Sequence, residues 1–139
     1  MAGAIRGTME ADMVPMIHLQ RPRLLLVDDD ERLAAVVAGL LDIDGYEVVR
    51  TITRATEVVA AVAETDPDLI VLDLVLPDGD GLDVADELRA TGYERPIVVF
   101  SSLFDHRVHA TSLSQGYGYV EKVEGLDSLE AAIEEGLDA

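Results

Sequence analysis

The sequence contains no cysteine and only one lysine among its 139 residues. Without cysteine, the chain cannot form disulfide bonds, thiolate zinc sites or a cysteine nucleophile. No apolar run is long enough to cross a bilayer. The first twenty residues also lack the basic start and apolar centre of an export signal. We therefore expect a cytoplasmic protein.

Positive charge is scarce as well. The chain has 28 aspartate and glutamate residues against 10 lysine and arginine residues, a formal net charge of −18 at pH 7. Such a field repels the phosphates of nucleic acids and anionic lipids, so we expect no direct binding to nucleic acid and none to membranes. The single lysine, Lys122, is therefore of particular interest.

The length suits one domain, and 49% hydrophobic residues are enough to form a core. Residues 1–22 show no sustained periodicity and are expected to be a flexible tail, whereas residues 23–139 are expected to fold as one domain. In this domain, β-type runs alternate with helical stretches, which predicts an α/β fold with a parallel sheet and helices on both faces. The five predicted strands are residues 24–27, 46–50, 69–72, 97–100 and 117–121.

Five helices are predicted between and after these strands, so no residues remain for an output domain. The first carries an apolar stripe that ends before Gly45, and the last opens with Asp127 and Glu130 in the spacing of a capping box. The stripe of the first helix consists of Leu33, Val36, Val37, Leu40 and Leu41.

Groups able to support chemistry follow four of the five predicted strands. Three aspartates, residues 28–30, follow the first strand, and Asp73, Ser101 and Lys122 follow the third, fourth and fifth. Because the carboxyl ends of parallel strands face one crevice, these side chains are expected to meet at the same edge of the sheet.

Taken singly, most of these residues have plainer interpretations. Asp29 or Asp30 would serve as a helix N-cap, Ser101 as a loop hydroxyl and Lys122 as an exposed lysine. Asp73 is different, because it directly follows an apolar strand. An ionised carboxylate there, close to two others, is costly unless a cation compensates it. Mg²⁺ suits such a site because it binds oxygen ligands and accepts a phosphate as a further ligand.

The combination resembles the receiver domains of two-component response regulators. The resemblance extends from about Arg23 to the C-terminus and implies a doubly wound, flavodoxin-like sheet of five parallel strands in the order 2-1-3-4-5. It rests on four segments in matching order and spacing: residues 24–30 (LLLVDDD), 68–82 (DLIVLDLVLPDGDGL), 96–102 (PIVVFSS) and 119–122 (YVEK).

The resemblance implies a role for each residue of the site. Asp73 would accept a phosphoryl group from the phosphohistidine of a sensor histidine kinase or phosphotransfer protein. Mg²⁺ would be bound by Asp29, by Asp28 through water, by Asp73 and by the backbone carbonyl of Val75. Such a domain only assists its own phosphorylation and dephosphorylation, so we do not expect a turnover enzyme.

The resemblance also implies how the signal would be transmitted. Lys122 would pair with Asp73 and then with a phosphoryl oxygen, while Ser101 would donate to another. Tyr119 would follow Ser101 inward and change the face formed by the fourth helix, fifth strand and fifth helix. A downstream protein, or a second copy in a homodimer, would bind this face of a stand-alone response regulator.

Two departures from the family pattern lie close to the lysine. Val123 stands where the family usually has proline, often after a cis peptide bond. A cis bond without proline costs about 2.5–4 kcal/mol, so we expect a trans bond and a differently shaped loop. The segment 115–119 is one residue shorter than usual.

Two other functions remain open. A pseudo-receiver would bind partners without phosphorylation, and the altered loop at Lys122 is compatible with that. A haloacid-dehalogenase-like phosphatase also uses an aspartate nucleophile and Mg²⁺, and Asp28 and Asp30 have its Asp-x-Asp spacing. However, residues 31–33 (Glu-Arg-Leu) follow, instead of the expected hydroxyl residue and cap insertion.

Overall fold

The computed structural model describes residues 20–139. The predicted flexible tail, residues 1–22, therefore lies almost wholly outside the described residues. Within its last part, the Arg21 guanidinium lies 3.1 Å from the Asp42 carboxylate and donates to the Tyr46 carbonyl at 2.6 Å. These contacts hold the chain just before the first strand against the turn at residues 42–46.

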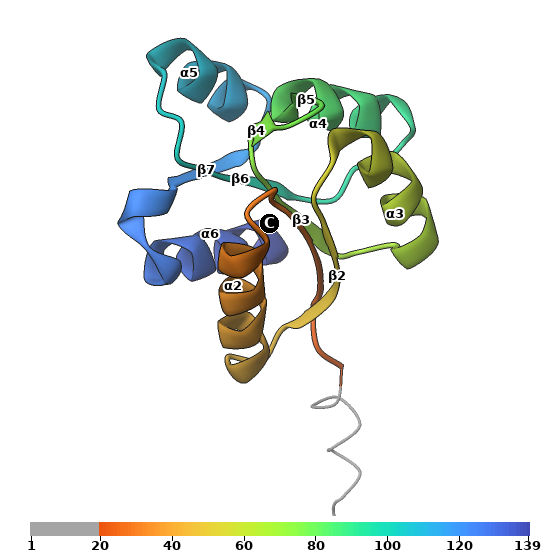
Figure 1. Ribbon diagram of the computed structural model, residues 1–139, viewed down its shortest axis with the longest axis vertical. Helices are drawn as coiled ribbons and strands as arrows, with labels where there is room; N and C mark the ends of the chain where they lie inside the picture. The colour runs from red at the N-terminus through yellow and green to blue at the C-terminus, as the bar shows by residue number, and fades with distance from the viewer. Residues whose placement is uncertain (1–19) are drawn as a thin grey trace, which may run out of the picture.

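Five strands form one parallel sheet in the order β2-β1-β3-β6-β7 (Figure 1). Counted along the chain, this is the predicted order 2-1-3-4-5, and the predicted fold class is confirmed. All four residues of the central strand β3 are buried, because helices cover both faces of the sheet. The strands are β1 (Arg23–Val27), β2 (Glu47–Ile52), β3 (Leu69–Leu72), β6 (Ile97–Ser101) and β7 (Gly118–Glu121).

Among residues 20–139, five α-helices cover the sheet, two on one face and three on the other (Figure 1). One face is covered by α2 (Glu31–Ile43) and α6 (Leu126–Asp138). Among the described helices, none has both the length and the apolar character that a membrane span requires. The opposite face is covered by α3 (Val58–Thr65), α4 (Gly81–Ala90) and α5 (His106–Ser114).

Two 3-10 turns and one short hairpin were not predicted, and all three follow the carboxyl ends of strands of the main sheet. A 3-10 turn, η2 (Ala55–Glu57), comes after β2, and a second, η3 (Lys122–Glu124), comes after β7. Between β3 and α4, an antiparallel hairpin pairs β4 (Val75–Leu76) with β5 (Gly79–Asp80). These elements shape the edge of the sheet at which the predicted site lies.

The predicted apolar stripe of the first helix was partly wrong. The buried residues of α2 are Ala34, Val37 and Leu41, whereas Val36 and Leu40 are exposed. Apolar residues surround much of this helix, so the pattern alone does not define the face that packs on the sheet.

The predicted capping box of the last helix was also wrong. Helix α6 begins at Leu126, its N-cap is Gly125, and no side chain caps it. A capping box does form just before it, where Glu121 and Glu124 exchange hydrogen bonds around η3. The error arose because Gly125, at φ 89°, starts the helix earlier than the side-chain spacing indicated.

Candidate functional site

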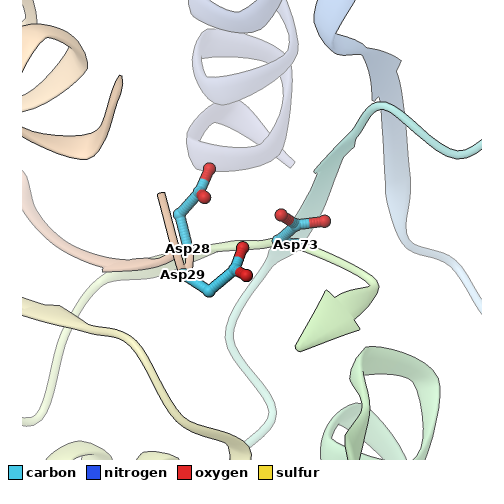
Figure 2. A group of neighbouring side chains, drawn as sticks. All are labelled: Asp28, Asp29 and Asp73. Carbon is cyan, nitrogen blue, oxygen red and sulfur yellow. The ribbon is translucent and has the colours of Figure 1, made fainter. Parts of the chain in front are cut away.

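Three carboxylates meet where β1 and β3 end. These strands are parallel neighbours with Val27 opposite Leu72, so the residues that follow them emerge side by side. Figure 2 shows Asp28, Asp29 and Asp73 gathered at this edge. One oxygen from each lies within 4.8 Å of the others, close enough to hold one metal ion. The clustering expected from the strand ends is confirmed.

Two of these carboxylates are withdrawn from solvent. Asp28 is 2% exposed and Asp73 is 3% exposed, whereas Asp29 is open to solvent. Burial raises the pKa of Asp28 above its usual value, although hydrogen bonds from Lys122 and from the Asp30 backbone partly oppose this. The cluster is therefore costly to leave without a nearby cation.

Lys122 supplies one positive charge to the cluster. Its Nζ lies 2.8 Å from Asp28 Oδ2 and 3.0 Å from Asp73 Oδ2. Burial alone would lower the pKa of Lys122, but hydrogen bonds to the two carboxylates raise it above its usual value, so the ammonium stays charged. Against three carboxylates, one ammonium leaves two negative charges, which a divalent ion would balance.

The other oxygen of Asp73 accepts from two donors. The buried Ser101 hydroxyl donates to Asp73 Oδ1 at 3.0 Å, and the Val75 N–H reaches the same oxygen at 3.2 Å. Ser101 Oγ also accepts from the Leu103 N–H at 3.2 Å. These donors, together with Lys122, hold the Asp73 carboxylate in one orientation.

The hairpin that carries Val75 is fixed by Asp78, whose importance the sequence did not reveal. Its carboxylate accepts from the N–H groups of Ala55 at 2.6 Å and Thr56 at 3.0 Å. Burial would raise the pKa of Asp78, but these hydrogen bonds and nearby Arg54 lower it to about 2. No local signal could have identified Asp78, because its partners lie more than twenty residues earlier in the chain.

A close backbone approach also shapes this loop. A side chain at Gly81 would come within 2.7 Å of Leu74 Cα and nearer still to the Asp73 carbonyl oxygen. Only glycine therefore allows α4 to start directly beside the backbone of Asp73. The Asp80 side chain caps the same helix by accepting from the Leu82 N–H at 2.7 Å.

Tyr119 lies on β7 at the side of the site. Its hydroxyl donates to the Leu103 carbonyl at 2.6 Å, and its ring packs edge-on against His109 with the centroids 4.8 Å apart. Since the Leu103 N–H binds Ser101, the backbone of Leu103 connects Ser101 to Tyr119.

The donor set suits Mg²⁺, which prefers carboxylate and carbonyl oxygens and retains some of its water. Asp30 lies outside the cluster, because its carboxylate caps α2 by accepting from the Leu33 N–H at 3.0 Å. The Asp-x-Asp pair of a haloacid-dehalogenase-like phosphatase is therefore not assembled. The third aspartate of the cluster is instead Asp73, which directly follows β3.

Comparison with known proteins agrees with this geometry. Residues 24–134 match the family model of the response regulator receiver domain. The chain is 34% identical over 121 residues to a protein-glutamate methylesterase/protein-glutamine glutaminase of Nocardioides sp. (strain ATCC BAA-499 / JS614), covering 84% of this chain and 33% of that protein. Among the curated relatives it matches first, the chain spans about a third to a half of their length.

Solved structures give the same result. A LuxR-family two-component response regulator from Aurantimonas sp. SI85-9A1 superposes with a TM-score of 0.80 at 29% identity, covering 86% of each chain. The BeF3-activated N-terminal receiver domain of RstA from Klebsiella pneumoniae superposes with a TM-score of 0.77 at 29% identity, covering 84% of this chain and 99% of that one. With the match over residues 24–134 and the acidic pocket at the ends of β1 and β3, this chain belongs to the response regulator receiver domain family of two-component signalling.

Proposed function

We propose that the chain accepts a phosphoryl group on Asp73 from the phosphohistidine of a sensor histidine kinase or phosphotransfer protein. The main support is the position of Asp73, which is buried beside two further carboxylates and has Lys122 Nζ at 3.0 Å. A divalent cation in this cluster would offset the carboxylates, and Lys122 would remain beside Asp73 to pair with the incoming phosphoryl group.

Mg²⁺ would be held by Asp29 and Asp73 directly, by Asp28 through water, and by the Val75 carbonyl. It would neutralise charge between the carboxylate and the incoming phosphoryl group. The hydrogen bonds between the Asp78 carboxylate and η2 support this assignment, because they hold the hairpin that carries the Val75 carbonyl.

The transfer itself needs little more than positioning and charge neutralisation. A carboxylate oxygen of Asp73 attacks phosphorus, the bond from phosphorus to the histidine nitrogen breaks, and the donor imidazole leaves with the electron pair. Lys122 then pairs with a phosphoryl oxygen instead of the free carboxylate, and the Ser101 hydroxyl donates to another phosphoryl oxygen. Both groups already contact Asp73, so each has only a short distance to move.

The signal would leave the site through Leu103. When Ser101 turns toward the phosphoryl group, the Leu103 N–H that is hydrogen-bonded to it moves as well. Tyr119 then moves too, because its hydroxyl is hydrogen-bonded to the Leu103 carbonyl. This movement shifts the conformational equilibrium of the surface formed by α5, β7 and α6. A downstream protein or a second copy of the chain would bind there.

The module would act as a phosphorylation-controlled binding switch and not as a turnover enzyme. Activities named for longer relatives belong to those proteins, of which this chain covers only part. The pseudo-receiver remains the second candidate because Val123 follows the lysine in place of the usual proline.

Intact-mass measurement after incubation with acetyl phosphate and Mg²⁺ tests the proposal. We expect the mass of one phosphoryl group to be added to the wild type and to Asp83→Asn, which alters an exposed carboxylate on α4. We expect no addition to Asp73→Asn or in the presence of EDTA. An unmodified wild type would favour the pseudo-receiver, and undiminished labelling of Asp73→Asn would place the acceptor elsewhere.

A further inference from the structure

The segment after β7 must direct Lys122 across the sheet edge. Lys122 is the first residue of η3, and its side chain reaches Asp28 and Asp73, which follow β1 and β3. The orientation of the Lys122 backbone therefore decides whether the ammonium reaches both carboxylates. Val123, next in the chain, is 87% exposed, so burial of its side chain contributes little to holding this turn.

Hydrogen bonds hold the turn instead. The Glu124 carboxylate accepts from the Glu121 N–H at 2.8 Å, and the Glu121 carboxylate accepts from the Glu124 N–H in return. The Gly125 N–H donates to the Lys122 carbonyl at 3.1 Å. These three hydrogen bonds thus hold the backbone on both sides of Lys122. Gly125, at φ 89°, ends the turn.

A three-residue 3-10 turn has little stability of its own, so its side-chain caps largely determine whether it forms. We propose that Glu124 is a positioning residue for Lys122: by capping η3 it keeps the ammonium directed at Asp28 and Asp73. This inference rests on the proposed function, because Lys122 is there assigned to the phosphoryl oxygen. It gives a role to a glutamate that touches neither the carboxylates nor the phosphoryl group.

Two variants separate the reach of Glu124 from its charge. Glu124→Asp keeps the charge but is one methylene too short to span the turn. Glu124→Gln removes the charge but keeps an oxygen that can accept the Glu121 N–H. Glu135→Gln, at an exposed position on α6, controls for the loss of one negative charge.

Phosphorylation by acetyl phosphate is measured at saturating Mg²⁺, and Mg²⁺ affinity is measured separately by calorimetry. We expect the rate constant to fall on the order of tenfold in Glu124→Asp, because small misplacements of a catalytic group cost this much or more. Glu124→Gln and Glu135→Gln should stay near the wild-type rate. Mg²⁺ affinity should not weaken in any variant, because Lys122 is not a metal ligand.

A second readout uses the fact that Lys122 is the only lysine in the chain. With lysine labelled by ¹³C at Cε, one NMR signal reports on this side chain, and an immobilised ammonium gives inequivalent Cε protons. We expect this inequivalence in the wild type and in Glu124→Gln, and its loss in Glu124→Asp.

Several results would overturn the proposal. One is a phosphorylation rate constant and a Cε signal in Glu124→Asp equal to those of the wild type. Another is a rate constant that falls in Glu124→Gln and not in Glu124→Asp. A third is a loss of Mg²⁺ affinity in Glu124→Asp that parallels its loss of rate. If the wild type is not phosphorylated at all, the proposed function fails, while the lysine signal still decides whether Glu124 positions Lys122.

Discussion

Lys122 Nζ lies between two buried carboxylates, 2.8 Å from Asp28 Oδ2 and 3.0 Å from Asp73 Oδ2. One ammonium therefore compensates two aspartates that follow different strands. This arrangement connects the end of β7 to the ends of β1 and β3. The contacts of the site therefore also contribute to the free energy of unfolding.

Replacing Lys122 with methionine should destabilise the chain by about 3 kcal/mol in EDTA, because it leaves buried carboxylates uncompensated. Mg²⁺ should restore more stability to this variant than it adds to the wild type, since the ion replaces the missing charge. Urea unfolding with EDTA and with Mg²⁺ measures both effects. A variant as stable as the wild type in EDTA would mean that the ammonium does not compensate this cluster.

Asp29 should contribute to metal binding more than to stability, because it is the exposed member of the acidic group. We expect Asp29→Asn to weaken Mg²⁺ binding by at least about tenfold, the loss that even indirect partners of a metal cause. Calorimetric titration measures this, with Asp83→Asn as the control for the lost charge. Equal affinities for the two variants would argue against a direct ligand.

Stability should fall between weakly acidic and neutral pH because of Glu130. The nearby Asp44 carboxylate, with which protonated Glu130 would share its proton, raises the pKa of Glu130 from the ordinary 4.5 to about 7, together with burial and further carboxylates. The folded state therefore binds the proton more tightly, so this stabilisation is complete below about pH 4.5 and is lost as the pH rises through 7.

Glu130→Gln should remove this pH dependence by keeping a neutral side chain at all pH values. Thermal unfolding followed by circular dichroism from pH 4.5 to 8 should show a smaller decline for the variant than for the wild type. Parallel curves for the two proteins would mean that Glu130 ionises normally.

The phosphorylated form should lose its phosphoryl group slowly. Val75 and Leu103 lie at the rim of the site, both partly exposed and both apolar. Apolar side chains cannot orient water for attack on the acyl phosphate. We expect Val75→Asn to hydrolyse faster than the wild type, as measured by loss of the phosphoryl mass after acetyl phosphate is removed. A wild-type half-life of seconds in Mg²⁺ would contradict this account.

The sequence predicted where the side chains after the strands would meet better than it predicted the elements around them. Asp28, Asp73, Ser101 and Lys122 each follow or end a strand, and a parallel sheet brings such positions to one edge whatever the details of packing. The order of the strands came from the family resemblance. Alternation alone indicates a parallel sheet without saying which strands are neighbours.

The remaining features depend on contacts between distant parts of the chain. Asp78 caps η2 through the N–H groups of Ala55 and Thr56, and a local pattern holds no information about that pairing. The inward face of α2 carries Ala34, Val37 and Leu41, and these pack in one cluster with buried residues of β1, β3, β6 and α6. The misplaced capping box shows the same limit, because Gly125 decides where α6 begins.

We expect Asp73, and no other aspartate of the cluster, to carry the phosphoryl group. Borohydride reduction of the acetyl phosphate-treated protein converts a phosphorylated aspartate to homoserine, which peptide mass spectrometry then locates. We predict homoserine at residue 73 when Mg²⁺ is present and none when it is chelated. Homoserine at residue 28 or 29, or at no position, would contradict the account.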